Sequence, residues 1–309
     1  MGRLNRAVII NCPPFDEQSG GCIVLHYLAH RLRRKGVRAY VFPLLEEPIN
    51  GQTRWRRARQ RTDILRKYQS GELTYKVHPA LDTPLAPVSA FYRGIVLYPE
   101  IVSGDPLAMR RIARWILFTP RGHGVGESFE RPIPREEVFY FQAPFIEHIP
   151  WISPENLLRL QWYRDDIFKD PGDVERSLIC RMIRKGTSTA DIPLDAAKDA
   201  VLLDGKSNEE IAETFKRSAL FYCHDPYTMY CDYAAICGCL PIVIPKIGIS
   251  IDDWRPEEDR RGIAYGDSPE QLDWARRTRE GLLNRIADLR SQEDAMLDHF
   301  IDRLRRAFN

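Results

Sequence analysis

Short apolar runs alternate along the chain with longer segments whose apolar residues recur every three or four positions. Residues 6–11 and 37–44 are such runs, and residues 22–35 between them have the helical pattern. The apolar face of this helix consists of Val24, Leu25, Leu28 and Leu32. A strand, an amphipathic helix and a second strand in this order predict a βαβ unit.

The same order of elements returns in the second half of the chain. Residues 219–222 are apolar and aromatic, residues 227–237 contain neither proline nor glycine, and residues 240–244 are again apolar. Gly238 is well placed to end the helix, since glycine is common just beyond a helix C-terminus. The acidic loop after the first strand is therefore expected at the carboxyl end of that strand, where open α/β sheets bind ligands. The start of the helix suits a phosphate, because its first N–H groups have no partner within the helix.

Further strand-like runs extend both halves of the chain. They lie at residues 95–98, 114–118, 137–141, 177–183, 200–204 and 262–266. Asp105 and Pro106 are expected to begin another helix, and Ser207 with Glu210 predicts a capping box. Proline and polar residues interrupt the pattern near residues 146–154, which indicates a domain boundary.

These patterns predict an α/β protein with two Rossmann-like domains. The first domain is expected at residues 1–152, the second at 153–268, and a helical tail at 269–309. A chain of 309 residues is long enough for two domains of ordinary size.

Composition and charge exclude several classes of protein. A formal net charge of +2 gives no general attraction to nucleic acid, so no nucleic-acid partner is expected. No apolar run reaches the ~20 residues of a membrane helix, and the N-terminus lacks a secretory pattern, so we expect a cytoplasmic protein.

The seven cysteines lack CxxC spacing and lie mostly in apolar runs, so we interpret them as reduced core residues. No metal site is predicted.

One segment, residues 54–67, is strongly basic. Its cations are Arg54, Arg56, Arg57, Arg59, Arg61, Arg66 and Lys67. One interpretation is a basic amphipathic helix that contacts anionic lipid, or a lipid-linked acceptor, at the inner face of the membrane. The other is a solvated helix whose Trp55 side packs on the body of the protein.

Several residues of the first half are placed at the predicted ligand edge. They are Ser19, Gly20 and Gly21 before the first helix, Glu100 after the strand at 95–98, and His123 in a glycine-rich loop. Glycine lets backbone approach a ligand closely, although this motif is not the dinucleotide fingerprint GxGxxG. A tight turn, a connecting loop and an exposed histidine are the respective alternatives.

The second half supplies a basic and an acidic group of candidates. The strand at 177–183 carries Arg181 and leads into Arg184-Lys185-Gly186. Asp225 follows the strand at 219–222, and the predicted helix carries Tyr227, Thr228 and Asp232. An exposed basic strand end and a helix cap without a ligand are the alternatives.

The segment from Asp225 through Pro245 resembles the donor-binding signature of retaining GT-B glycosyltransferases. That signature is an acidic residue, a short loop, a helix with a second acidic residue, and alanine-rich sequence before an apolar strand. Asp225 matches the first acidic place, whereas the second falls on Tyr233. Asp232 lies one position earlier, about 100° away on a helix.

Three other segments match the same family in the expected order: Ser19-Gly20-Gly21, Tyr98-Pro99-Glu100 and Arg184-Lys185-Gly186. The likeness is greatest to bacterial glycosyltransferases of polysaccharide and cell-surface glycan assembly, including rhamnosyltransferases.

The resemblance implies two domains that face a cleft, with the C-terminal helix crossing back to the first. It implies transfer of a sugar from a nucleotide-diphosphate sugar to a glycan or lipid-linked acceptor, with retention and without a metal or permanently bound cofactor. Asp225, Lys185 and Arg184 would be catalytic, since fixed cations stabilise the charge that develops on a leaving diphosphate. Glu100 and His123 would face the acceptor.

The remaining candidates would bind the donor in this family: Ser19, Gly20, Gly21, Arg181, Tyr227, Thr228 and Asp232. Two other hypotheses stay open. One is a non-catalytic relative that binds a nucleotide or glycan, and the other is a different two-domain α/β enzyme, such as a sugar-nucleotide epimerase or a phosphorylase-like protein.

Overall fold

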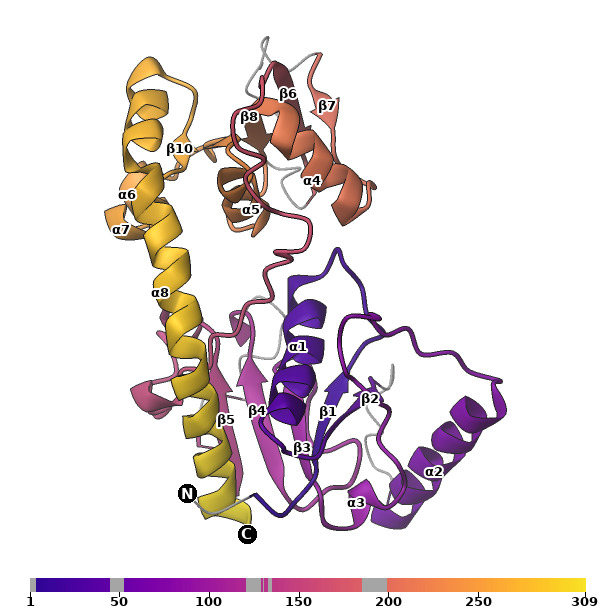
Figure 1. The fold of residues 1–309 in the computed structure, drawn as a ribbon. Helices are drawn as coiled ribbons and strands as arrows, with labels where there is room; N and C mark the ends of the chain where they lie inside the picture. The colour runs from indigo at the N-terminus through magenta and orange to yellow at the C-terminus, as the bar shows by residue number, and fades with distance from the viewer. Residues whose placement is uncertain (1–3, 45–52, 121–128, 130, 133–134, 185–198) are drawn as a thin grey trace. The chain divides into compact units, whose positions relative to one another are not determined.

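The computed structural model in Figure 1 describes residues 4–44, 53–120, 129, 131–132, 135–184 and 199–309. The chain divides into two compact units. Unit 1 consists of Met1–Trp162 with Arg290–Asn309, and unit 2 is Tyr163–Leu289.

The core of unit 1 is a parallel sheet of five strands. These are β1 (Val8–Cys12), β2 (Ala39–Pro43), β3 (Ile95–Pro99), β4 (Ile112–Ile116) and β5 (Glu136–Tyr140), in the spatial order β2-β1-β3-β4-β5. Most strand residues are buried, which explains why these strands read as continuous apolar runs rather than as alternating patterns. The strand order reverses between β1 and β3, so the carboxyl ends of these two strands form the switch point of the sheet.

Helices cover both faces of this sheet. On one face, α1 (Gly20–Arg34) and the last part of α8 (Pro269–Phe308) pack on the strands through residues such as Leu28 and Phe300. On the other face lie α2 (Arg54–Ser70) and α3 (Ala90–Arg93), which contribute Leu65 and Phe91. Two short 3-10 helices, η3 (Ala143–Ile146) and η4 (Pro154–Asn156), follow β5.

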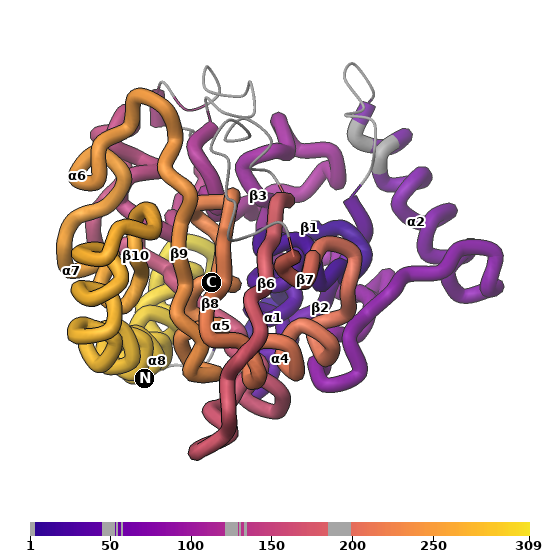
Figure 2. The backbone as a smooth tube through the Cα atoms, turned by 90° about the horizontal axis from the view of Figure 1, so that it is seen from above, coloured from indigo at the N-terminus to yellow at the C-terminus, as the bar shows by residue number. Residues whose placement is uncertain are grey.

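Unit 2 repeats this topology. Its strands are β6 (Leu178–Met182), β7 (Val201–Leu202), β8 (Ser218–Cys223), β9 (Leu240–Val243) and β10 (Ala264–Tyr265), again all parallel, in the order β10-β9-β8-β6-β7. Figure 2 shows these strands lying side by side in that order. Its helices are α4 (Asn208–Arg217), α5 (Tyr230–Ile236), α6 (Ile251–Trp254), α7 (Glu257–Arg260) and the first part of α8. The switch point of this sheet lies between β6 and β8.

The prediction of an α/β protein with Rossmann-like parallel sheets is therefore confirmed. The capping box is also confirmed, because the Ser207 hydroxyl accepts the Glu210 N–H while the Glu210 carboxylate accepts the Ser207 N–H. All seven cysteines are buried and have free thiols, as expected for core residues.

Two predicted helix starts are wrong. The helix expected from residue 227 begins at Tyr230, because residues 225–228 form turns of their own. No helix follows Asp105: its carboxylate accepts the N–H of Met109 at 2.9 Å and the hydroxyl of Tyr98 at 2.8 Å, and the residues between form a turn. Among the described residues, no helix is both long and apolar enough to cross a bilayer.

Candidate functional site

The switch point of unit 2 gathers most of the predicted donor-side residues. The N–H of His224, which follows β8, donates to the carbonyl of Met182, which ends β6, at 3.0 Å. The two loops therefore leave the sheet side by side. Arg184 comes from the loop after β6, and Asp225 from the loop after β8. Lys185 and Gly186 lie outside the described residues.

Asp204 holds the end of β6 in place. Its carboxylate accepts the N–H of Ile183 at 2.8 Å and the N–H of Arg184 at 2.7 Å. The backbone of Arg184 is unusual at this point. Its φ is 44°, in the left-handed region that residues with a Cβ rarely adopt. Sequence reasoning missed Asp204, and the available signal was its place at the end of a predicted strand and before Gly205.

The side chain of Arg184 lies against the first turn of α5. Its guanidinium carbon is 5.1 Å from the centre of the Tyr230 ring. The Tyr230 hydroxyl in turn donates to Oδ1 of Asn208 at 2.8 Å, in a buried contact with α4. Arg184 is thus held at the loop by its backbone and over an aromatic ring by its side chain.

Arg181 and His224 complete a basic group at this edge. The Nε–H of Arg181 is buried and has no acceptor among the described residues. Burial lowers the pKa of His224, the charge of Arg181 lowers it further, and Asp204 acts in the opposite direction. A bound anion would raise the pKa of His224, because negative charge favours the protonated imidazole.

Asp225 closes a tight turn. Its Oδ1 accepts the N–H of Tyr227 at 3.3 Å, and its carbonyl accepts the N–H of Thr228 at 3.4 Å. The Thr228 hydroxyl oxygen accepts the N–H of Tyr230 at 3.4 Å. Tyr227 is 62% exposed, with the guanidinium of Arg255 at 5.6 Å from its ring. Asp225 is therefore part of a turn three to five residues before α5, and one of its carboxylate oxygens shapes that turn.

The structure does not bring Asp232 into this group. Residues two positions apart on a helix point roughly 200° apart, so Asp232 faces away from the side of α5 on which Tyr230 meets Arg184. Asp232 is buried and forms an ion pair with Arg285 of α8 at 3.4 Å. Tyr233 is buried as well, and its ring stacks parallel to Phe168 at 4.0 Å.

The switch point of unit 1 brings together the predicted residues of that half. The Ser19 hydroxyl caps α1 by accepting the N–H of Cys22 at 3.4 Å. A Cβ on Gly21 would lie 3.8 Å from the Leu117 side chain, and a Cβ on Gly20 would meet nothing within 4 Å. The N–H of Leu117 donates to the carboxylate of Glu100 at 2.9 Å. The start of α1 and the loops after β3 and β4 therefore meet at this edge. His123 lies outside the described residues.

Glu100 is a buried acid at the end of β3. Glu100 is only 3% exposed, and this burial raises the pKa of its carboxyl group to about 7. Hydrogen bonds from the backbone N–H groups of residues 117 and 118 lower this pKa, but by less than burial raises it. A carboxyl with this pKa exists in both protonation states near neutral pH, so it is able to accept or donate a proton.

A buried polar cluster, also missed from the sequence, supports the loop after β1. Nε2 of His26 lies 3.0 Å from the carbonyl of Pro13, and the Tyr75 hydroxyl lies 2.8 Å from the same oxygen. The Tyr75 hydroxyl also contacts Sγ of Cys12 at 3.1 Å. Burial lowers the pKa of His26 and raises those of Cys12 and Tyr75, so all three are neutral at pH 7.

Fold and loops together define a doubly wound α/β protein with two switch-point edges, one basic and one carrying a buried acid. No known protein-family model matches the chain, and no curated protein matches its sequence. Within the part of the chain that the structure describes, no three His, Cys, Asp or Glu side chains are grouped closely enough to hold a metal ion.

Proposed function

We propose that this protein is a glycosyltransferase that moves a sugar from a nucleotide-diphosphate sugar to a glycan or lipid-linked acceptor. The two units would face one cleft in a GT-B arrangement, with retention at the sugar carbon. The observation that carries the proposal is the basic edge of unit 2. Arg181, Arg184 and His224 lie at the carboxyl ends of β6 and β8, where a doubly wound sheet binds its ligand.

The donor diphosphate would bind at this basic edge. Arg184 is held in place through Asp204 and Tyr230, so little reorganisation is needed when charge develops on the leaving group. An oxygen of the diphosphate would accept the buried Nε–H of Arg181. Lys185 would add a further cation, and Asp225 would accept hydrogen bonds from sugar hydroxyls.

The acceptor would bind against unit 1. Gly20 and Gly21 at the start of α1 have no side chains, so an acceptor could approach their backbone closely. Glu100 would hydrogen-bond the acceptor hydroxyl. Closure of the two units would exclude water, which otherwise hydrolyses the donor.

The test is a thermal-unfolding screen against nucleoside diphosphates and nucleotide sugars. A ligand present at about 100 times its dissociation constant stabilises a protein by roughly 2.7 kcal/mol, which gives a clear rise in Tm. We expect a rise for one base, and its loss in Arg184→Ala and Lys185→Ala. Arg217→Ala is the matched control, since Arg217 is an exposed arginine at the other end of the unit 2 sheet. A rise that survives in Arg184→Ala and Lys185→Ala contradicts the proposed donor site.

A specific observation favours the non-catalytic alternative. The second acidic place of the resembled signature holds Tyr233, which packs in the core, and the neighbouring Asp232 is paired with Arg285. A non-catalytic relative would bind a nucleotide without turnover. Release of nucleoside diphosphate from a panel of labelled nucleotide sugars, with cell-envelope glycans as acceptors, separates the two functions.

A further inference from the structure

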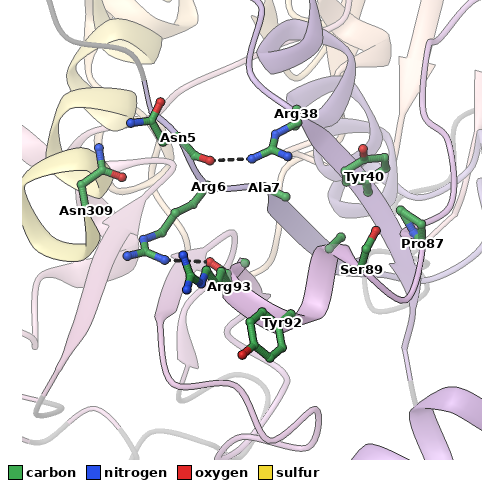
Figure 3. A pocket seen from close by; sticks show the side chains of 12 residues that line it. Asn5, Arg6, Ala7, Arg38, Tyr40, Pro87, Ser89, Tyr92, Arg93 and Asn309 are labelled. Carbon is green, nitrogen blue, oxygen red and sulfur yellow. Dashed lines mark hydrogen bonds between the residues drawn. The ribbon is translucent and has the colours of Figure 1, made fainter.

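A concave region lies at the opposite end of the unit 1 sheet from the switch point. It is a pocket of about 450 Å³, lined by residues at or just before the amino ends of β1, β2 and β3, and by residues of α3. Figure 3 shows its side chains. Ligand pockets for small molecules have volumes of about 300–1,000 Å³, so this pocket is large enough for one.

Three arginines line this pocket: Arg6, Arg38 and Arg93. The side-chain hydrogen bonds of Arg6 and Arg38 go to backbone carbonyls. Arg6 donates through Nη1 to the carbonyl of Arg93 at 3.2 Å and through Nε to that of Phe308, and Arg38 donates to the carbonyl of Asn5. In the described part of the chain, none of the three forms an ion pair with a carboxylate. The lining residues include no aspartate or glutamate, so three arginines share one pocket without an acidic side chain.

This arrangement brings like charges close together. Burial lowers the pKa of Arg6, and the like charges of Arg111 and Arg93 lower it further. Arginines are normally stabilised by an opposite charge, and one bound anion would offset several of these repulsions at once.

The other polar groups on the walls fit the same kind of ligand. Ser89, Tyr40 and Tyr92 are lining residues that carry hydroxyl groups, and Tyr92 is 83% exposed. Arginine and hydroxyl donors in one concave site match the oxygens of a phosphate group, which accepts paired hydrogen bonds from the guanidinium fork.

We propose that this arginine pocket binds a phosphate-bearing small molecule, at a site separate from the proposed donor edge of unit 2. Two sources share this chemistry, a soluble phosphate compound and a phospholipid headgroup. The pocket goes beyond the glycosyltransferase proposal, because neither donor nor acceptor was assigned to the amino ends of these strands.

The first experiment is titration calorimetry of the full chain with inorganic pyrophosphate. We expect saturable binding at the pocket that weakens at least tenfold in the double variant Arg38→Gln/Arg93→Gln. Both arginines are exposed and lie outside the apolar core, so this variant is expected to fold, which circular dichroism checks. Arg34→Gln, which changes an exposed arginine of α1 that does not line the pocket, is the control and should bind as wild type.

Because pyrophosphate also resembles a donor diphosphate, the titration is repeated in the Arg184→Ala background. Binding that survives there and is lost on adding Arg38→Gln/Arg93→Gln belongs to the pocket. Binding that disappears with Arg184→Ala alone, or that is unchanged in Arg38→Gln/Arg93→Gln, overturns the proposal and leaves the donor site untouched.

Vesicle sedimentation distinguishes the two sources of phosphate. Phosphatidylcholine vesicles with and without phosphatidylglycerol are compared for wild type and Arg38→Gln/Arg93→Gln. Loss of the phosphatidylglycerol-dependent fraction in the variant assigns the phosphate to a lipid headgroup, and an unchanged fraction with loss of pyrophosphate binding assigns it to a soluble compound. If the variant keeps both pyrophosphate binding and the phosphatidylglycerol-dependent fraction, the proposal is overturned.

Discussion

Arg184 shows how one residue can be held at a binding edge by its backbone. Its left-handed φ and its N–H bond to Asp204 fix the direction in which the side chain leaves the sheet. Strain of this kind persists only where surrounding contacts impose it, and it is concentrated at functional sites.

Comparing Arg184→Gly with Arg184→Ala separates the effect of backbone strain on stability from the effect of the arginine charge on binding. Arg184→Gly should be more stable than Arg184→Ala by roughly 0.5–1 kcal/mol, because relief of the left-handed cost (about 1–2 kcal/mol) outweighs the added freedom of the unfolded chain (about 0.4–1 kcal/mol). Both variants should lose nucleoside diphosphate binding, since both lack the guanidinium. Urea unfolding and the thermal screen measure the two effects. If Arg184→Gly were less stable than Arg184→Ala by about 0.4–1 kcal/mol, which is the unfolded-chain cost alone, the backbone would be unstrained.

A second prediction concerns Glu100 and the dependence of protein stability on pH. Its pKa is raised from 4.5 to about 7, so the folded protein holds the proton more tightly than the unfolded chain. The resulting stabilisation is complete below pH 4.5 and is lost as pH rises through 7. Compared with Glu100→Gln, which is neutral at every pH, wild type should lose up to about 3 kcal/mol of unfolding free energy between pH 4.5 and 8.

Urea unfolding of both proteins at several pH values measures this difference. The other carboxyl groups are common to the two proteins and cancel. A constant difference across the range would mean that Glu100 titrates normally in the folded state.

At the residue scale, the sequence located Asp225, Arg184 and Glu100 at sheet edges, because each directly follows a strand. It could not locate Asp204 as the support of Arg184, since that role depends on β7 lying next to β6. It also could not show that Asp232 turns toward α8, because a partner 53 positions away in the chain decides this.

Among the elements, α2 is attached to unit 1 by only part of its surface. Leu65 is buried, and Arg61 donates to the carbonyl of Leu107 at 2.8 Å while its guanidinium lies 4.4 Å from the Phe91 ring. Trp55 is 69% exposed, so the side of the helix that carries it packs on the body at Leu65 but not at Trp55. An exposed tryptophan beside exposed cations matches the surface that anionic membranes attract.

We therefore expect the wild-type protein to sediment with vesicles that contain phosphatidylglycerol, and less so at high salt. Each basic side chain near such a surface contributes about 1 kcal/mol, so Arg59→Glu/Arg66→Glu should weaken partitioning at least tenfold. The exposed residues Arg217 and Arg276 of unit 2 provide a control with the same charge change, Arg217→Glu/Arg276→Glu. Equal loss in both double variants would point to net charge rather than α2.

Element boundaries were harder to predict than the elements. Asp105 before a proline has the sequence of a helix start, but Tyr98 and Met109 use its carboxylate for a turn. The segment at 227–229 lacks helix breakers, but the Asp225 and Thr228 side chains accept backbone N–H groups there and delay α5. Local competition of this kind is not visible in hydrophobic periodicity.

For the whole molecule, periodicity was sufficient to predict two parallel sheets, since buried parallel strands are continuous apolar runs. It does not identify the arginine pocket, whose lining comes from residues 5–7, 38–40, 87–94 and 309. Only the strand order brings these segments together.

Hydrogen exchange tests the assignment of ligands to the two units. A nucleoside diphosphate should slow exchange at residues 181–184 and 224–230 of unit 2. Pyrophosphate in the Arg184→Ala background should instead slow exchange at residues 5–7 and 89–94 of unit 1. Peptides from α2 serve as the internal control and should not change. Protection that appears in the opposite unit would refute the corresponding assignment.

Helix α8 has a consequence for how the protein is made. Its first part belongs to unit 2, whereas residues 290–309 belong to unit 1 and place Leu297, Phe300 and Leu304 in the core of that unit. Domains generally fold in order as they leave the ribosome. Here the first unit to be synthesised cannot complete its core until the last twenty residues have emerged, so unit 2 has all its residues available first. A nascent chain stalled before residue 290 would hold an open apolar face on unit 1, the part of the molecule for which chaperones would compete.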